Sequence, residues 1–512
     1  MSKKIIVIGA GIGGLTAGAL LAKRGYAVTI YDQAYVAGGC ASTFKRHGFT
    51  FDVGATQVAG LEQGGIHQQI FTELGIEPPP ATPCDPACAV YLPGEKTPIN
   101  IWRDPEKWRK ERQSQFPNSE PFWQLMAKLF QASWHFQQRN PVLPPRNLWD
   151  MWQLISAVRP ETLITLPFTF LTVGDILRIL GLDDDLRLKT FLDMQLKLYS
   201  QVNADETALL YAATALGMSQ APQGLWHLQG SMQTLSTRLV KGLRKHGGKL
   251  RLRHRVKSIH TQLTGVTIQN EKTGEIWKEE ADAVVANVTV QNLLNLLPGA
   301  DQLFGVSQFL FKGYERRVKN LPEANGAFVL YLGVDETAIP ENCPPHLQFL
   351  YDSQGIVGEK NSLFVSVSRA GDGRAPQGQA TITASAFTEV GQWWTDTPES
   401  YERLKQDYVE TAIKNLSQYF HLTEETIIHQ EAATPRTFAR FTARQAGYVG
   451  GLGQRVSTFG PFGFANRTPI KNLWLVGDAT HPGEGTAGVS YSALTAVRQL
   501  ERVVSLGTNT ND

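Results

Sequence analysis

Four closely spaced glycines near the N-terminus could bring the backbone against a phosphate group. They are Gly9, Gly11, Gly13 and Gly14. Residues 5–8, before them, form an apolar β-branched run that predicts a buried parallel strand, and residues 15–24, after them, have helical composition. A second predicted strand, residues 27–31, leads to Asp32, whose carboxylate can accept hydrogen bonds from ribose hydroxyls. This order of elements predicts a dinucleotide-binding unit.

Each part of this unit has a physical role. Gly9 permits a tight turn, Gly11 lets the backbone approach a pyrophosphate, and Gly14 lets the helix pack closely on the sheet. The free N–H groups at the start of the helix receive the phosphate charge. The pair Gly38 and Gly39 follows soon after the acid, where it would let the chain pass close to a second part of the same cofactor. This second approach favours FAD over NAD.

The C-terminal segment carries the matching half of such a site. Residues 473–476 predict a strand that ends before Asp478, and residues 486–500 have helical composition. An acid between a strand end and a glycine loop is well placed to bind the ribityl chain of a flavin, while the helix start would direct its positive end toward the ring. The residues expected to contact the flavin here are Gly477, Asp478, Thr486 and Ala487. Both ends of the chain are therefore predicted to meet around one FAD.

Two internal segments are predicted to complete the cofactor unit. A helix is expected to open at residues 230–235 and to end near Leu243, and residues 249–259 predict a strand in which the backbone of Val256 could face the adenine. Residues 283–287 predict a further strand of the same sheet. The fold class is therefore α/β, with a discontinuous Rossmann-like FAD-binding domain and a substrate domain of mixed sheet and helices. The expected boundaries are 1–95, 225–300 and 435–505 for the first domain, and 96–224 and 301–434 for the second.

The insert at residues 100–225 is the candidate substrate region. It holds six tryptophans, namely Trp102, Trp108, Trp123, Trp134, Trp149 and Trp152. Its most apolar stretch, residues 163–173, is too short to span a bilayer but long enough to dip into one leaflet. The alternative is a packed helical domain whose aromatic residues are core. A second sheet, expected at residues 326–333, 363–368 and 380–387, could form the floor of a substrate cavity.

Composition limits the partners and the compartment. The chain has 512 residues and a formal net charge of +2, so nothing argues for nucleic acid as a partner. Its four cysteines match no zinc pattern, no metal is expected, and so few thiols favour a reducing compartment. A disulfide between Cys84 and Cys88 is the alternative. Because no run is apolar over the roughly 18–20 residues that a span needs, we expect a cytoplasmic protein attached to a membrane surface without crossing it.

These motifs resemble the carotenoid desaturase and isomerase family, which belongs to the amine-oxidase-like flavoproteins. The resemblance spans nearly the whole chain, and its specific motifs are the N-terminal glycines, residues 38–57, residues 230–260 and the closing loop at residues 477–488. Within the family, residues 38–44, 54–57 and 480–488 look closest to the cyanobacterial C-3',4' desaturases. The prolycopene cis–trans isomerases are next. The resemblance implies an acyclic carotenoid as substrate.

Two positions depart from the family pattern. Many relatives carry Arg or Pro where this chain has Ala37, so neutralisation of the phosphates is expected from Lys45 or Arg46. Glu484 stands where many relatives carry a neutral residue, and it could act on protons or cap a loop. His481 adjoins the flavin loop and is the other candidate for catalysis.

The expected reaction is dehydrogenation of a polyene. A hydride would leave one saturated carbon for the flavin and a proton would leave its neighbour, while a quinone or oxygen would reoxidise the flavin. Three alternatives stay open. Reduced flavin could catalyse isomerisation without net redox change, the chain could oxidise amines, or it could escort prenylated lipids without being an enzyme.

Overall fold

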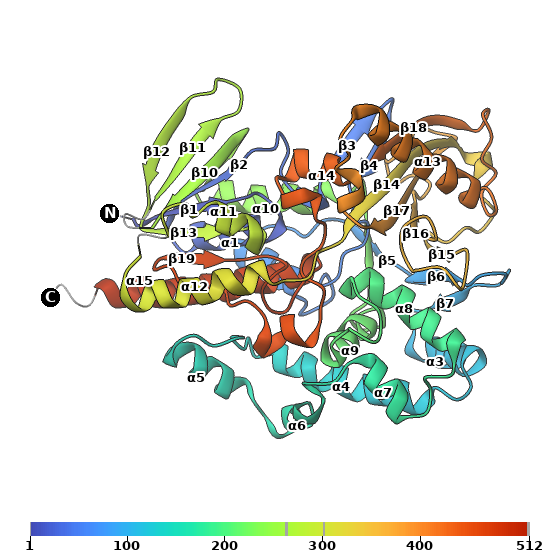
Figure 1. Ribbon diagram of the computed structural model, residues 1–512, viewed down its shortest axis with the longest axis horizontal. Coiled ribbons are helices and arrows are strands. Elements are labelled where there is room, and N and C mark those ends of the chain that lie inside the picture. Colours follow the sequence, from blue (N-terminus) through green and yellow to red (C-terminus); the bar gives the residue numbers. More distant parts are fainter. Residues whose placement is uncertain (1, 262–264, 301–302, 509–512) are drawn as a thin grey trace.

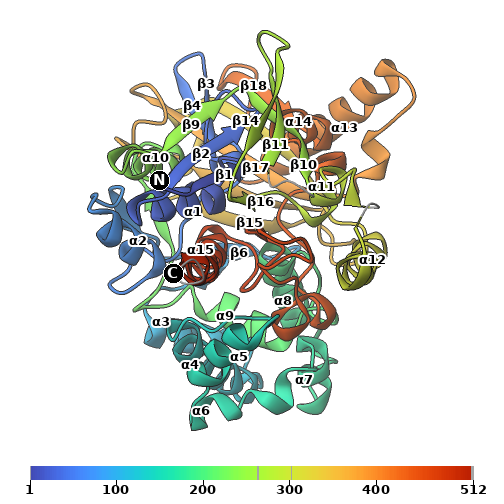
Figure 2. The ribbon, with the colours of Figure 1, turned by 90° about the vertical axis from the view of Figure 1, so that its left-hand side faces the viewer.

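Two large β-sheets organise the chain, and each is built from segments that are distant in sequence (Figures 1 and 2). The computed structural model describes residues 2–261, 265–300 and 303–508. Over this part of the chain, no helix combines the length and the apolar character needed to cross a membrane. The N-terminal strand and the C-terminal helix lie at the same end of the molecule (Figure 1).

The first sheet has five parallel strands, and the N-terminal glycine turn follows its central strand. Its apolar β-branched residues are buried because layers of structure cover both faces, as is usual for parallel sheets. In spatial order, its strands are β19 (Leu473–Leu475), β13 (Ala283–Ala286), β1 (Lys4–Ile8), β2 (Ala27–Asp32) and β9 (Lys249–Leu252).

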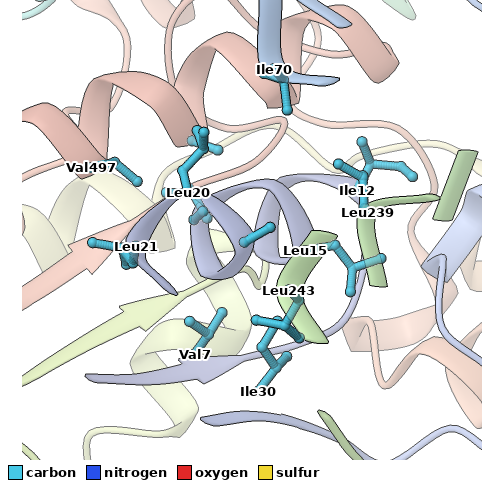
Figure 3. Close-up of a cluster of buried hydrophobic side chains, with 14 of the residues drawn as sticks. Val7, Ile12, Leu15, Leu20, Leu21, Ile30, Ile70, Leu239, Leu243 and Val497 are labelled. Atoms are coloured by element: carbon cyan, nitrogen blue, oxygen red, sulfur yellow. The ribbon is translucent and has the colours of Figure 1, made fainter. Parts of the chain in front are cut away.

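Helices cover one face of this sheet, and a small sheet covers the other. On the helical side, Leu15 and Leu20 of the first helix pack on Val7 and Ile30 of the strands and on Val497 of the last helix (Figure 3). The helices of this side are α1 (Ile12–Lys23), α2 (Ile66–Leu74), α10 (Gln233–Lys245) and α15 (Thr486–Thr508). The opposite side contains β10 (His254–His260), β11 (Gly265–Asn270), β12 (Ile276–Glu280), α11 (Val290–Asn295) and α12 (Gly305–Lys319).

The second sheet is mixed and has seven strands. Its strands pair antiparallel, except that β15 runs parallel to β6. In spatial order they are β18 (Ile427–Ala433), β14 (Gly326–Asp335), β17 (Gln379–Thr388), β16 (Ser362–Val367), β15 (His346–Leu350), β6 (Cys88–Tyr91) and β7 (Ile99–Ile101). The three strands expected from sequence are thus present. Two antiparallel pairs of strands lie beside these sheets: the hairpin of β3 (Thr43–Arg46) with β4 (Phe49–Asp52), and β5 (Ala81–Pro83) with the distant β8 (Trp226–Leu228).

A layer of helices lies below both sheets in Figure 1 and encloses a second hydrophobic core. Its members are α3 (Pro105–Gln115), α4 (Glu120–Gln138), α5 (Leu148–Ala157), α6 (Pro160–Leu163), α7 (Val173–Ile179), α8 (Leu186–Ser200) and α9 (Leu209–Gly217). The remaining helices, α13 (Pro398–Leu416) and α14 (Pro435–Thr442), pack against the seven-stranded sheet. The expected combination of a mixed sheet with a helical insert is therefore observed.

Two of the expected domain boundaries are corrected by this topology. Residues 88–91 were expected in the cofactor domain, but they form β6 and pair with β15 of the other sheet. Residues 305–319 were expected in the substrate domain, but Phe311 and Val318 of this helix pack into the core beside the five-stranded sheet. Both errors concern pairings across long sequence separations, which local patterns do not specify.

Several local expectations also need correction. The strand expected over residues 249–259 is split into β9 and β10, because Arg253 adopts a left-handed backbone with φ of 59°. The first helix begins at Ile12 rather than at residue 15, so its first turn includes two of the glycines. Cys84 and Cys88 are both free thiols, so the alternative of a disulfide between them is wrong.

Candidate functional site

A single cavity of about 1210 Å³ lies between the five-stranded sheet, the seven-stranded sheet and the helical layer. Ligand pockets commonly hold about 300–1,000 Å³, so this one has room for more than a drug-sized molecule. The predicted site residues that line it are Gly9, Gly11, Gly13, Asp32, Gly38, Gly39, Val256, Gly477, Asp478, His481, Glu484, Thr486 and Ala487. The structure therefore brings together nearly all of the predicted site.

The N-terminal glycine turn is tight because another chain segment presses against it. Gly9 has φ of +91°, and a Cβ there would lie 2.6 Å from the carbonyl oxygen of Asn287. A Cβ on Gly14 would lie 2.0 Å from the carbonyl oxygen of Gly9, so this glycine lets the helix start close to the turn. Gly11 caps the helix without a side-chain hydrogen bond, and Gly11, Ile12 and Gly13 all face the cavity. The geometry fits a bound pyrophosphate at a helix N-terminus.

The two ends of the chain meet at this turn, as predicted. A Cβ on Gly13 would lie 3.6 Å from the Cα of Gly477 and 3.4 Å from the carbonyl oxygen of Val489. The N-terminal residues of α15 line the cavity, so the positive end of this helix dipole faces it. Asp478, also in the lining, forms an ion pair of 2.5 Å with Arg444.

Asp32 lies at the end of β2, at the nucleotide side of the cavity. Its two carboxylate oxygens accept backbone hydrogen bonds from Ala10 (2.6 Å) and Ala34 (2.7 Å), which fix the carboxylate and leave lone pairs for a ribose. Burial raises the pKa of Asp32 from its ordinary value, and the two backbone hydrogen bonds oppose that shift. Val256 also lines the cavity, and its contact with the adenine stays a prediction.

Arg46 and Lys45 do not take the expected position. Neither lines the cavity, and Arg46 is half-exposed in an ion pair with Glu431 on the outer strand of the seven-stranded sheet. The expectation that one of them neutralises the phosphates is therefore corrected. The lining instead holds Arg255, Lys257 and Arg444. Gly14 is also outside the lining, in keeping with its packing role.

The two catalytic candidates differ in their protonation. His481 lies with Nε2 2.8 Å from Oε1 of Gln137, and burial lowers the pKa of His481 to about 4. The imidazole is therefore neutral at neutral pH. Burial raises the pKa of Glu484 to about 8, with a further contribution from the charge of Asp478. This carboxyl can consequently change its charge near physiological pH.

Beyond the nucleotide side, the cavity continues as an apolar section. The strands β14, β16 and β17 form one wall, to which they contribute Ala327, Val329, Phe364, Ser385 and Phe387. The prediction that these strands form the floor of a cavity is confirmed. The other wall consists of residues from the helical layer and its loops, including Leu154, Leu166, Leu198, Leu210 and Met218.

The apolar section reaches the surface at an exposed apolar patch, here named the α5–α6 patch. Its members are Leu148, Met151, Trp152, Ile155, Leu163, Ile164, Leu166 and Phe170. Ile155 and Leu166 belong both to the patch and to the cavity lining, so the cavity opens there. The tryptophans of this region do not all fit one expectation. Trp108 and Trp123 are core residues, as expected for a packed helical domain, whereas Trp152 is 63% exposed, as expected for a membrane contact.

Comparison with known proteins identifies the family. Residues 12–500 match the family described as "Flavin containing amine oxidoreductase". The chain belongs to this family. It is 26% identical to the chloroplastic prolycopene isomerase of Daucus carota, over 97% of this chain and 79% of that protein. It is 23% identical to the 4,4'-diaponeurosporene oxygenase of Staphylococcus aureus, over 96% of this chain and 97% of the other.

Solved structures share the fold. An oxidoreductase from Methanosarcina mazei has a TM-score of 0.63 at 17% identity, over 97% of this chain and all of that one. Cyclohexylamine oxidase from Brevibacterium oxydans has a TM-score of 0.60 at 16% identity, over 98% and 100% of the two chains. The family match, rather than these structures, shows that the chain is an FAD-dependent oxidoreductase, and the alternative of a non-enzymatic lipid escort is set aside.

Sequence reasoning missed three residues of the site. Asn287 closes over the glycine turn, Arg444 pairs with Asp478, and Gln201 hydrogen-bonds Glu484. Asn287 could have been found, because it ends a predicted strand of the cofactor sheet. Arg444 and Gln201 lie in segments without a motif, so no local signal indicated them.

Proposed function

We propose that this enzyme is a carotenoid desaturase of the C-3',4' type, which introduces a double bond into an acyclic carotenoid. One observation carries the proposal: a single cavity joins the dinucleotide-binding glycines to a long apolar section that opens at the α5–α6 patch. A polyene is long and apolar, so it needs a site of this kind beside the flavin. The names of the relatives, a prolycopene isomerase and a 4,4'-diaponeurosporene oxygenase, support a polyene substrate.

The chain's own residues would bind FAD in an extended form across the five-stranded sheet. The β1–α1–β2 unit supports a Rossmann-like mode of binding, with pyrophosphate at the start of α1 and ribose at Asp32. Asp478 and the start of α15 would hold the ribityl chain and the ring. Bound FAD supplies the oxidation by accepting a hydride. The apolar walls orient the polyene and keep water away from the reacting carbons.

The α5–α6 patch supports a peripheral contact with a membrane, from which the substrate would reach the cavity. Trp152 and Phe170 are 63% and 68% exposed, as expected for side chains that enter a lipid interface. We place the enzyme on the cytoplasmic side of such a membrane, where a quinone or oxygen would reoxidise the flavin. The motif resemblance favours a cyanobacterial source.

Isomerisation of a cis-carotenoid is the second candidate. The observation that favours it is the similarity to prolycopene isomerases, which covers 97% of this chain. Reaction stoichiometry separates the two functions, because a desaturase consumes one two-electron acceptor for every double bond made. An isomerase leaves the mass of the carotenoid unchanged.

The test is product analysis in cells that accumulate lycopene or its 1'-hydroxy derivative. Expression of the enzyme should yield a product that is lighter by two hydrogens and absorbs at longer wavelength. A product of unchanged mass and altered geometry would replace the proposal with isomerisation. Purified enzyme, loaded with FAD and supplied with a quinone, should reduce the quinone in step with double-bond formation.

A further inference from the structure

The carboxyl group of Glu484 has two oxygens in different surroundings. Oε2 accepts hydrogen bonds from Nε2 of Gln201 (2.7 Å) and from the backbone N–H of Gly451 (3.4 Å). Oε1 is shielded from solvent and has no hydrogen-bond partner among the residues that the structure describes. Glu484 belongs to the cavity lining, so a rotation of its carboxyl group would bring the unpartnered oxygen to the cavity, where it could exchange a proton.

Burial, together with the charge of Asp478, makes Glu484 a stronger base than an ordinary carboxylate. Asp478 from the same loop shares the neighbourhood, and its charge is balanced by the ion pair with Arg444. The other titratable groups on this side are Tyr211 of α9, Cys40 and His481. Because burial and Asp478 both disfavour a second negative charge, the pKa of Glu484 rises to about 8. A general base is most effective when its pKa lies near the working pH.

The backbone of Gln201 and its neighbours hold the side chain beside Glu484. It follows α8 with a left-handed backbone, φ of 65° and ψ of 2°, which is uncommon for a residue with a side chain. Its carbonyl oxygen accepts a hydrogen bond from Nδ2 of Asn325 (3.0 Å). A Cβ on Gly450 would lie 1.6 Å from Nε2 of Gln201, so the glycine leaves the space that the amide occupies.

We propose that Oε1 of Glu484 takes the proton that leaves the polyene, and that Gln201 is a positioning residue for Glu484. This inference rests on the proposed dehydrogenation. As a hydride leaves one saturated carbon for FAD, the C–H bond of its neighbour breaks. The electron pair of that bond becomes the new π bond, and the proton forms an O–H bond with Oε1. Gln201 donates a hydrogen bond to Oε2, so Oε1 is the oxygen left to take the proton once the carboxyl group turns toward the cavity.

His481 is a weaker candidate for this step. Its Nε2 faces the amide oxygen of Gln137, so its unpartnered nitrogen is Nδ1, which is shielded from solvent just as Oε1 of Glu484 is. With a pKa of about 4, the imidazole takes up a proton less readily than the carboxylate of Glu484.

The test compares Glu484→Gln and Gln201→Leu with wild-type holoenzyme between about pH 6 and 9.5. The control is Glu62→Gln, because Glu62 is another buried carboxyl with a raised pKa but lies outside the cavity lining. The wild-type rate of double-bond formation should rise with pH and level off near the pKa of Glu484. Glu484→Gln should lower the rate by about 10²–10⁴-fold and abolish that rise. Gln201→Leu should shift the midpoint of the pH profile, and Glu62→Gln should change neither quantity.

A second measurement does not depend on activity. Infrared spectra of wild-type protein should show a protonated carboxyl band that disappears between about pH 6 and 9.5 and is absent in Glu484→Gln. Persistence of the same titrating band in Glu484→Gln overturns the inference. If Glu484→Gln keeps the wild-type rate and pH profile, the inference is also overturned, while the proposed desaturase function stands. Wild-type holoenzyme that forms no double bond overturns the proposed function and this inference together.

Discussion

At the scale of single residues, the cavity combines one carboxyl that is easily protonated with one imidazole that is not. The pKa of Glu484 is raised to about 8 and that of His481 is lowered to about 4, in both cases chiefly by burial. Burial favours the neutral form of each group. The neutral form of Glu484 is its protonated carboxyl group, whereas the neutral form of His481 is its deprotonated imidazole. Near neutral pH, Glu484 is therefore the one of the two that can gain or lose a proton.

The protonation of Glu484 predicts how stability depends on pH. Its pKa in the folded protein, about 8, lies above its ordinary value of 4.5, so the folded state holds a proton that the unfolded state has lost. The stability from this group is complete below pH 4.5 and is lost as the pH rises through 8. Glu484→Gln stays neutral, so its melting temperature relative to wild type should rise from about pH 5 to 8 and then level off. A difference independent of pH would contradict this assignment.

The close packing at Gly14 predicts a large cost for one added methyl group. A Cβ there meets the backbone oxygen of Gly9, which no side-chain rotation can move aside. Gly14→Ala should lower the free energy of unfolding by about 3 kcal/mol or more, as measured by urea denaturation, and should reduce the FAD content. The control is Gly313→Ala in α12, where a Cβ meets nothing within 4 Å. That change should raise stability by about 0.5–1 kcal/mol.

At the scale of elements, sequence patterns predicted the cofactor half of the molecule well. The β1–α1–β2 unit, β13, β19 and the start of α15 all lie where residue periodicity and glycine spacing indicated. Each of these elements is recognisable from its own residues, because a buried parallel strand is apolar throughout and a phosphate turn needs glycine. The strands of the second sheet were recognised for the same reason.

Pairings between distant elements could not be predicted in this way. β6 pairs with β15, more than 250 residues later in the chain, and nothing local in residues 88–91 specifies that partner. The correction to Arg46 has the same origin. Its side chain depends on the position of β18, whose Glu431 it meets, rather than on the nearby glycine pair.

A buried ion-pair network joins the β3–β4 hairpin to the seven-stranded sheet and its loops. Arg374 pairs with Asp52 and with Asp372, each at 2.9 Å, and all three side chains are buried. Arg374→Met should lower the free energy of unfolding by about 3–5 kcal/mol in urea denaturation, because it leaves two carboxylates without a cation. Arg46→Met removes a half-exposed pair with Glu431 from the same hairpin and should cost about 0–1 kcal/mol. Equal losses in the two variants would count against the network.

At the scale of the whole molecule, the cavity runs from the glycine turn to the α5–α6 patch, across the three layers of the fold. The cofactor signatures lie at one end of this path and exposed apolar side chains at the other. A water-insoluble substrate could therefore pass from a lipid phase to the flavin without crossing solvent. Support for a carotenoid substrate therefore comes from the course of the whole cavity, from the apolar patch to the cofactor residues, and not from any single residue.

Membrane contact through the α5–α6 patch can be tested with charged substitutions. Trp152→Glu combined with Phe170→Glu should weaken binding to phosphatidylcholine vesicles by more than about tenfold, since burial of each aromatic side chain contributes about 1.5–3 kcal/mol. Both side chains are mostly exposed, so folding and FAD content should stay at wild-type values. The control is Phe304→Glu with Phe309→Glu, which changes two still more exposed aromatics at α12, away from the opening of the cavity. Vesicle flotation measures binding, and turnover of carotenoid held in the vesicles should fall only in the first variant. If the control variant alone lost vesicle binding, α12 would be the membrane contact and the substrate would need another route to the cavity.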